Sequence, residues 1–212
     1  MSKTQDSVID DFHKMYYGDS SPHRWEKTSW LGIQTLKCPL DLWVYQEIVY
    51  DVKPDIIIET GTWSGGSALF LATICDSINN GMIFSIDISK KEFPFHNRIT
   101  YFTGSSTNDE IFKEVTKQVK KTDKVLVILD SDHSKEHVLK EMELYGNLIT
   151  KDSYLIVEDT NINGHPVLPD WGPGPMEAVE EFLLRHSEFS IDKSKEYLLM
   201  TFNPNGYLKK NS

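Results

Sequence analysis

Short apolar runs alternate with longer amphipathic segments along most of this chain, and this alternation constrains the fold more than any other feature. Short segments that are mainly apolar and predict strands occupy residues 55–59, 82–87, 99–102, 125–130 and 154–158, and the continuous apolar runs at 56–58 and 125–129 are typical of strands covered on both faces. Segments of helical length occupy residues 67–78, 108–120, 134–148 and 177–185, and a closing strand is expected at 197–202. The alternation predicts an α/β fold: a doubly wound, mostly parallel sheet with helices on both faces.

The first fifty residues differ in character from the rest, because Trp25, Trp30 and Trp43 cluster there. We therefore expect residues 1–50 to form an aromatic-rich extension that builds a substrate pocket or an oligomer contact. Residues 51–212 are expected to form the main, cofactor-binding domain. This concentration of tryptophans favours a homo-oligomer.

Composition excludes several classes of function. The chain has 32 acidic and 22 basic residues and a formal charge of −10, which disfavours nucleic acid as a partner. No apolar run approaches the roughly 20 residues that span a bilayer, and the first residues lack the pattern of a signal peptide. Only Cys38 and Cys75 are present, which does not describe a disulfide framework. A cytoplasmic protein without a membrane segment is expected.

Carboxylates end four of the five predicted strands. They are Glu59, Asp87, Asp130 and the pair Glu158 and Asp159. In open parallel sheets, ligands bind outside the carboxyl ends of the strands, where the strand order reverses. The acidic strand ends therefore locate the expected chemistry.

A glycine-rich turn follows the first of these strands, with the sequence ETGTWSGGS at residues 59–67. Glycines allow the backbone to bend tightly and to approach a ligand, although an ordinary connection can look the same. The spacing is not that of a dinucleotide-binding turn, and no Gly-Lys-Ser/Thr follows, so NAD and ATP are disfavoured. The candidate cofactor contacts in this turn are Glu59, Thr60, Gly61, Gly65 and Ser67.

Two further strand ends complete a nucleoside site. Asp87 lies 26 residues after Gly61, where a carboxylate can accept hydrogen bonds from both ribose hydroxyls. Gly104, Ser105 and Ser106 follow the third strand and suit the edge of a purine, although each of these features alone is compatible with a simple turn. Acidic groups beside a ribose site favour a cofactor with a cationic part over one with phosphates. S-adenosylmethionine has both features.

Acidic residues gather again after the fourth and fifth strands, as DSDH at residues 130–133 and as Glu158 and Asp159. Oxygen ligands of this kind suit Mg²⁺. A zinc site made of Asp130, His133 and His137 is the alternative, because the two histidines share one helix face. It is less favoured, since the neighbouring acids outnumber the imidazoles.

Together these motifs resemble the cephalosporin hydroxylase and rhamnosyl O-methyltransferase family. The segments that carry the resemblance are residues 37–43, 59–67, 129–134, 157–160 and 172–179. The resemblance implies a Rossmann-like, class I methyltransferase that depends on S-adenosylmethionine. It also implies that Asp130, Glu158 and Asp159 bind the metal and that His133 is the general base. Asp132 could replace Asp130 as a ligand, orient His133 or cap the following helix.

The function expected from the resemblance is O-methylation, dependent on S-adenosylmethionine and Mg²⁺, of a hydroxyl on a small polyhydroxylated acceptor such as a sugar, glycoside or secondary metabolite. Two alternatives are a non-catalytic adenosine- or metal-binding assembly protein and an iron hydroxylase. The second is disfavoured, because such iron sites usually need two histidines and one carboxylate.

The acceptor pocket is less specified by the sequence. Aromatic residues that could form its platform are Tyr16, Tyr17, Trp25, Trp30, Trp63 and Trp171, although such residues more often belong to a core or an oligomer contact. The long segment 161–175 has no periodic pattern and follows the metal acids, so it could act as a lid that carries His165 and Asp170.

Overall fold

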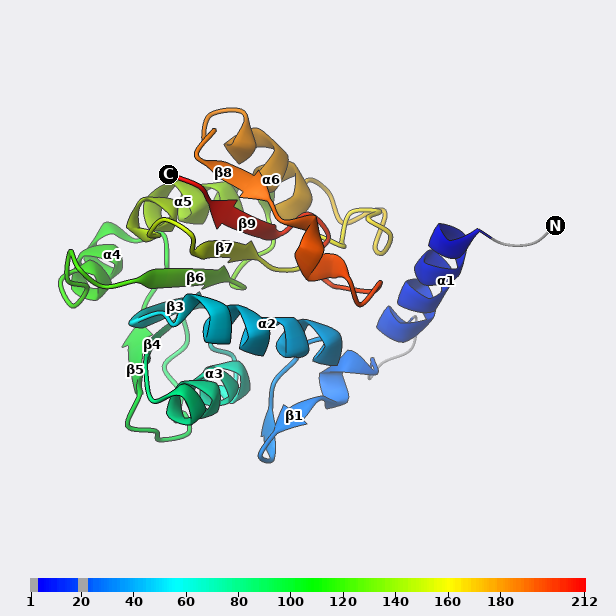
Figure 1. The fold of residues 1–212 in the computed structure, drawn as a ribbon. Helices are drawn as coiled ribbons and strands as arrows, with labels where there is room; N and C mark the ends of the chain where they lie inside the picture. The colour runs from blue at the N-terminus through cyan, green and yellow to red at the C-terminus, as the bar shows by residue number, and fades with distance from the viewer. Residues whose placement is uncertain (1–3, 19–22) are drawn as a thin grey trace.

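The computed structural model describes residues 4–18 and 23–212, and its centre is a seven-stranded sheet (Figure 1). The strand order is β5-β4-β3-β6-β7-β9-β8, and β9 runs antiparallel to β7 and β8 while the other pairs are parallel. The strands are β3 (Ile56–Thr60), β4 (Met82–Asp87), β5 (Ile99–Thr103), β6 (Val125–Leu129), β7 (Tyr154–Val157), β8 (Phe189–Ile191) and β9 (Tyr207–Lys210).

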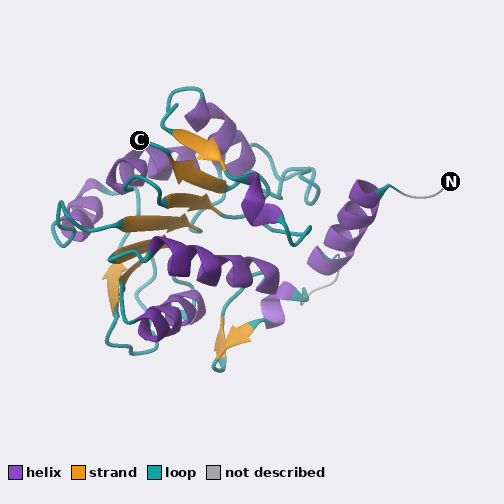
Figure 2. Ribbon diagram, viewed as in Figure 1, coloured by secondary structure: helices purple, strands orange, loops and turns teal. Residues whose placement is uncertain are grey.

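Helices cover both faces of the sheet (Figure 2). One face packs against α2 (Pro39–Val52) and α3 (Gly66–Ile78), and the other against α4 (Asp109–Thr116), α5 (Lys135–Tyr145) and α6 (Pro175–Leu183). Along β6, Leu126 and Ile128 point to the first layer while Val127 and Leu129 point to the second. Every residue of β6 is buried, which explains its continuous apolar run. The predicted doubly wound α/β fold is confirmed.

Local sequence signals set where several helices begin. Pro39 stands at the first turn of α2, where its missing N–H costs no hydrogen bond. Asn108 caps α4 by accepting from the backbone N–H groups of Glu110 and Ile111. The region before α2 contains helix α1 (Gln5–Tyr17) and a small hairpin of β1 (Ser29–Trp30) and β2 (Ile33–Gln34). Helix α2 crosses the expected boundary at residue 50, and the division into two regions stays a prediction.

The closing strand expected at 197–202 was wrong. This segment follows a 3₁₀ helix (Lys193–Glu196) and does not join the sheet, whose last strands are β8 and β9. Its polar groups are instead taken by buried Asp41 of α2, which accepts from the Phe202 backbone N–H at 2.9 Å and from the Thr201 hydroxyl. Burial raises the pKa of Asp41 to about 6, against the opposing effect of these hydrogen bonds. These two groups thus donate hydrogen bonds to a side-chain carboxylate and not to a neighbouring strand.

Helix α1 docks on the main body through His13, which is 4% exposed. Its ring stacks on Phe202 with centroids 5.5 Å apart, and the Asn161 side-chain amide donates to His13 Nε2 at 2.9 Å. Burial lowers the pKa of His13 to about 4, although nearby Asp10 opposes the shift.

Among the described residues, no helix combines the length and apolar character needed to cross a bilayer.

We expect His13 to make the stability of the fold depend on pH. The unfolded chain protonates His13 below about pH 6.5, whereas the folded chain does so only near pH 4. The contribution is therefore complete above pH 6.5 and is lost as the pH falls to 4, by up to about 3 kcal/mol. Urea unfolding of the wild type and of His13→Gln, whose amide does not titrate, measures it. Identical pH profiles for the two proteins would contradict the expectation.

Candidate active site

The carboxyl ends of β3 and β6 meet at Gly61, at the point where the strand order reverses. Gly61 has φ +86°, and a Cβ added there would lie 1.7 Å from the carbonyl oxygen of Asp130. Its N–H donates to the carbonyl of Ile86 at 2.8 Å. Glycine is therefore required at this position. It allows the glycine-rich turn after β3 to lie against the backbone of Asp130, one of the predicted metal ligands.

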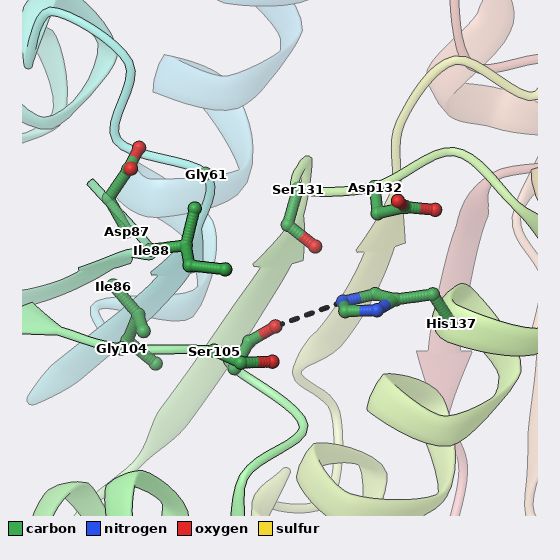
Figure 3. Close-up of a pocket in the computed structure, with 10 residues that line it drawn as sticks. Gly61, Ile86, Asp87, Ile88, Gly104, Ser105, Ser131, Asp132 and His137 are labelled. Carbon is green, nitrogen blue, oxygen red and sulfur yellow. Dashed lines mark hydrogen bonds between the residues drawn. The ribbon is translucent and has the colours of Figure 1, made fainter.

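A cavity of about 380 Å³ opens beside this contact (Figure 3). It brings together five of the residues predicted to bind the cofactor: Gly61, Asp87, Gly104, Ser105 and Ser106. Three polar residues that sequence reasoning did not assign to the cofactor, Ser131, Asp132 and His137, complete the wall with Ile86 and Ile88. Asp87 and His137 lie on opposite sides of the cavity (Figure 3).

The carboxylate of Asp87 is held by its own turn. Oδ2 accepts from the Trp63 backbone N–H at 2.9 Å, and Oδ1 accepts from the Ser89 N–H at 2.7 Å. Each carboxylate oxygen has about two acceptor sites, so both oxygens can accept a further hydrogen bond. The geometry thus orients Asp87 and leaves it able to bind a pair of hydroxyls.

The other four residues predicted to bind the cofactor, Glu59, Thr60, Gly65 and Ser67, do not line this cavity. Glu59 is fully buried, and its Oε2 accepts from the Ser85 hydroxyl at 2.6 Å. Burial raises the pKa of Glu59, against the opposing charge of Lys37. The Thr60 carbonyl accepts from the Asp130 N–H at 3.0 Å, and a Cβ on Gly65 would lie 2.7 Å from a carbon of Pro94. Ser67 lines a second cavity.

This second cavity, of about 500 Å³, shares Gly61, Asp87 and Ser131 with the first, so the two adjoin. Its lining combines three polar groups, Asp130, His133 and Asp159, with the aromatic residues Tyr17, His23, Trp25, Trp63 and Trp171. Four of the predicted platform residues are therefore brought to the acids. The other two do not line the cavity. The ring centroids of Trp30 and Phe70 lie 4.9 Å apart, and those of Tyr16 and Phe202 lie 6.0 Å apart.

Asp130, His133 and Asp159 each offer one ligand atom, and these atoms lie within 4.8 Å of one another. His133 Nε2 is 3.3 Å from Asp159 Oδ2. Asp159 has φ +53°, and its N–H donates to the side-chain oxygen of buried Asn203 at 3.2 Å, which holds the backbone in this left-handed conformation. Burial raises the pKa of Asp159, while His133 opposes the shift. The donor set of carboxylates and one imidazole can hold a divalent cation.

Asp132 and His137 do not belong to this group and line the first cavity instead. Asp132 is exposed and accepts from the Ser134 N–H at 2.8 Å, directly before α5. Hydrogen bonds from Ser134 lower its pKa. His137 Nε2 lies 3.2 Å from the Ser106 hydroxyl and 3.5 Å from buried Glu141. The structure therefore does not bring together the three residues of the alternative zinc site.

Lys37 also belongs to the site, and the sequence analysis did not predict it. It is 3% exposed, and its ammonium group donates both to Asp130 and, at 2.6 Å, to Glu158 Oε1. Burial alone would lower the pKa of Lys37, but Asp130 and Glu158 raise it above its ordinary value. Burial and Asp130 raise the pKa of Glu158, although Lys37 opposes the shift. The available signal was its place at the start of segment 37–43, which carries the family resemblance.

The predicted lid, residues 161–175, is hydrogen-bonded to Glu177 of α6. The Glu177 carboxylate pairs with His165 Nε2 at 2.9 Å and accepts from the Asn163 amide and the Gly174 N–H. Although burial opposes the shift, these hydrogen bonds lower the pKa of Glu177 to about 2. Leu168 and Trp171 from the same segment line the second cavity, whereas Asp170 is exposed.

Comparison with known proteins identifies the family of this chain. A family model described as rhamnosyl O-methyltransferase/CmcI matches residues 22–211. A rhamnosyl O-methyltransferase of Mycobacterium leprae (strain TN) is 40% identical over 210 residues, which cover 96% of this chain and 90% of that protein.

Two solved structures support the fold. A CmcI structure described as Mg-SAM superposes with a TM-score of 0.68 at 16% identity, over 100% of this chain and 88% of its own. A MycE methyltransferase from the mycinamycin biosynthetic pathway, in complex with Mg and SAH, gives a TM-score of 0.57 at 15% identity. The match covers 99% of this chain and 54% of the MycE chain.

The family match covers nearly the whole chain, and it includes all five segments on which the resemblance was based. The predicted enzyme class, an S-adenosylmethionine-dependent O-methyltransferase, is confirmed with it. The chain belongs to the rhamnosyl O-methyltransferase/CmcI family.

Proposed function

We propose that this protein transfers the methyl group of S-adenosylmethionine to a hydroxyl of a small polyhydroxylated acceptor, with the help of Mg²⁺. One observation carries the proposal: two adjoining cavities at the carboxyl edge of the sheet share Gly61, Asp87 and Ser131. The first holds the predicted nucleoside contacts, and the second holds the acids and the aromatic walls. A methyl donor in the first cavity and an acceptor in the second would meet at this shared wall.

The charges of the site support these cofactors. Four carboxylates, those of Glu59, Asp130, Glu158 and Asp159, lie near the ammonium group of Lys37. Such a group of acids, in which Glu59 and Glu158 are buried, favours a bound cation. Asp130 and Asp159, with Glu158 beside them, are the residues proposed to hold Mg²⁺. Mg²⁺ is also named in the CmcI and MycE structures, together with SAM and SAH respectively.

The side chains of this chain divide the work of the reaction. Asp87 holds the ribose, the acids orient the acceptor, and His133 accepts the proton of the attacking hydroxyl. His133 suits this role because its side chain lines the cavity, and its Nε2 lies 3.3 Å from Asp159 Oδ2, a carboxylate that can stabilise the ring once it is protonated. When bound, Mg²⁺ supplies the positive charge that favours ionisation of the hydroxyl.

The lining of the second cavity favours a sugar-like acceptor. Tyr17, Trp25, Trp63 and Trp171 supply flat apolar surfaces, and the acids between them supply hydrogen-bond acceptors for hydroxyl groups. The name of the curated relatives, rhamnosyl O-methyltransferase, points to the same class of substrate. A glycoside or a hydroxylated secondary metabolite is proposed on these grounds.

The alternatives have less support. An iron hydroxylase usually uses two histidines and one carboxylate, whereas the group seen among the described residues has one histidine and two carboxylates. A non-catalytic binding protein would not need a histidine beside the acids at the acceptor cavity. An activity screen with a labelled methyl donor across sugars, glycosides and catechols tests the proposal. Label transfer to a hydroxylated acceptor is expected, and binding of the donor without transfer to any acceptor would favour the non-catalytic alternative.

Asp87→Ala should weaken S-adenosylhomocysteine binding by about tenfold or more, because two ribose hydroxyls lose their acceptor. Titration calorimetry measures this effect. The same titration with a 2′-deoxy analogue is the control, since the wild type should discriminate between the two ligands and the variant should not. Equal affinity of wild type and variant for the ribosyl ligand would contradict the role of Asp87.

Several further expectations stay predictions: a cytoplasmic location, the absence of nucleic-acid partners and assembly as a homo-oligomer. The exposed side chains of Phe12, Met15 and Trp43 in the first fifty residues motivate the last of these. Sedimentation of the full chain as a monomer at micromolar concentration would contradict it.

A further inference from the structure

Lys37 reaches the candidate metal centre from outside the main sheet. It lies between β2 and α2, in a segment whose backbone is fixed on both sides. The Lys37 N–H donates to the Thr28 hydroxyl, and the carbonyl of Gln34 lies so close to α3 that a Cβ on Gly66 would approach it to 2.3 Å. These contacts fix the backbone that carries Lys37, whose ammonium group lies at the ends of β6 and β7.

At those strand ends, Lys37 contacts one oxygen of Asp130 and one of Glu158. All three side chains are largely shielded from water, with exposed fractions of 3% for Lys37, 20% for Asp130 and 6% for Glu158. Asp130 also belongs to the group with His133 and Asp159 that can hold a divalent cation. One carboxylate therefore serves both a resident ammonium group and the proposed metal.

We propose that Lys37 is a positioning residue of the metal centre, which holds Asp130 and Glu158 in place without a divalent cation and competes with that cation for their oxygens. The inference rests on the proposed metal-dependent function and adds to it a residue that sets metal affinity. Two positive charges that share a carboxylate repel each other, and this repulsion is strong where water is excluded. Removing the ammonium group should therefore strengthen metal binding.

The test compares Mn²⁺ and Mg²⁺ affinities by titration calorimetry. Lys37→Met removes the charge and keeps a chain of similar shape, and we expect it to bind each metal at least about tenfold more tightly than the wild type. Lys37→Arg keeps the charge and should not gain affinity. The matched control is Lys193→Met, which removes an exposed lysine that pairs with Glu196. It changes the net charge equally and should leave metal affinity unchanged.

A second measurement uses the wild type, in case the Lys37→Met protein fails to fold. Buried, paired ammonium groups give resolved ¹⁵N signals by NMR, and the Lys37 signal is assigned by its loss in Lys37→Arg. Titration with Mg²⁺ should shift or broaden this signal. Lys124 lies at the opposite, amino-terminal end of β6, and its ammonium group donates to the Val52 carbonyl. Its signal should not change.

The outcomes separate this inference from the proposed function. Equal or weaker metal affinity of Lys37→Met, or a Lys37 signal that Mg²⁺ does not alter, would overturn the role of Lys37. Methyl transfer by the wild type is measured in parallel with and without Mg²⁺. Transfer that does not depend on the metal would count against the proposed function instead.

Discussion

Asp130→Asn is expected to lower the rate of methyl transfer by about 10²- to 10³-fold or more, the effect typical of losing a positioned electrostatic group. The substitution keeps the shape of the side chain and removes the charge that Lys37 and the proposed metal share. Metal affinity should fall with it. Binding of S-adenosylmethionine should be nearly unchanged, because the side chains of Asp87, Ser105 and Ser106 line the nucleoside cavity. Turnover and calorimetric titrations of both ligands measure these effects.

The matched control is Asp132→Asn, which removes the same charge two residues later. Asp132 is exposed and bonded to Ser134, so we expect metal affinity close to that of the wild type. The control also decides between the two ligand assignments that the sequence left open. Loss of metal binding in Asp132→Asn with retention in Asp130→Asn would reverse the assignment.

His133→Gln is expected to reduce the rate by about 10²- to 10⁴-fold, the range of general-base catalysis. Its ring borders the acceptor cavity and faces Asp159, while the nucleoside cavity is lined by other residues. The affinity for S-adenosylmethionine should therefore be unchanged. Steady-state kinetics, with unfolding curves to check the fold, give the measurement.

A histidine elsewhere on the surface provides the control for this variant. His96 pairs with Asp76 away from both cavities, and His96→Gln should retain the wild-type rate. A wild-type rate for His133→Gln would remove it as the base. If His133→Gln loses metal binding, and its rate falls no further than the loss of the metal explains, His133 is a metal ligand rather than the base.

Much of the fold followed from the sequence because the relevant signals are local. The runs at 125–130 and 154–158 are continuous and apolar, and the structure makes strands of them that end one residue earlier. In α5, Val138, Met142 and Tyr145 recur at helical spacing, and all three are buried. Asp130 and Asp159, which follow two neighbouring parallel strands, lie close together because such strands share one carboxyl end.

What the sequence did not predict depends on contacts between distant residues. Asp41 accepts a hydrogen bond from the backbone N–H of Phe202, 161 positions later, in a segment that does not join the sheet. Lys37 joins Asp130 across 93 positions. Neither residue type nor local spacing marks these partners, since a lone lysine in an apolar segment is usually solvated at its tip. Such pairings arise only from the assembled fold.

The central claim is that the strand-end acids make methyl transfer depend on a divalent cation. The most direct test is the rate of S-adenosylhomocysteine formation by the wild type, with a glycoside acceptor found in the screen, after treatment with EDTA and after return of Mg²⁺. We predict loss of activity in EDTA and its recovery with Mg²⁺. Full activity in EDTA would contradict the account.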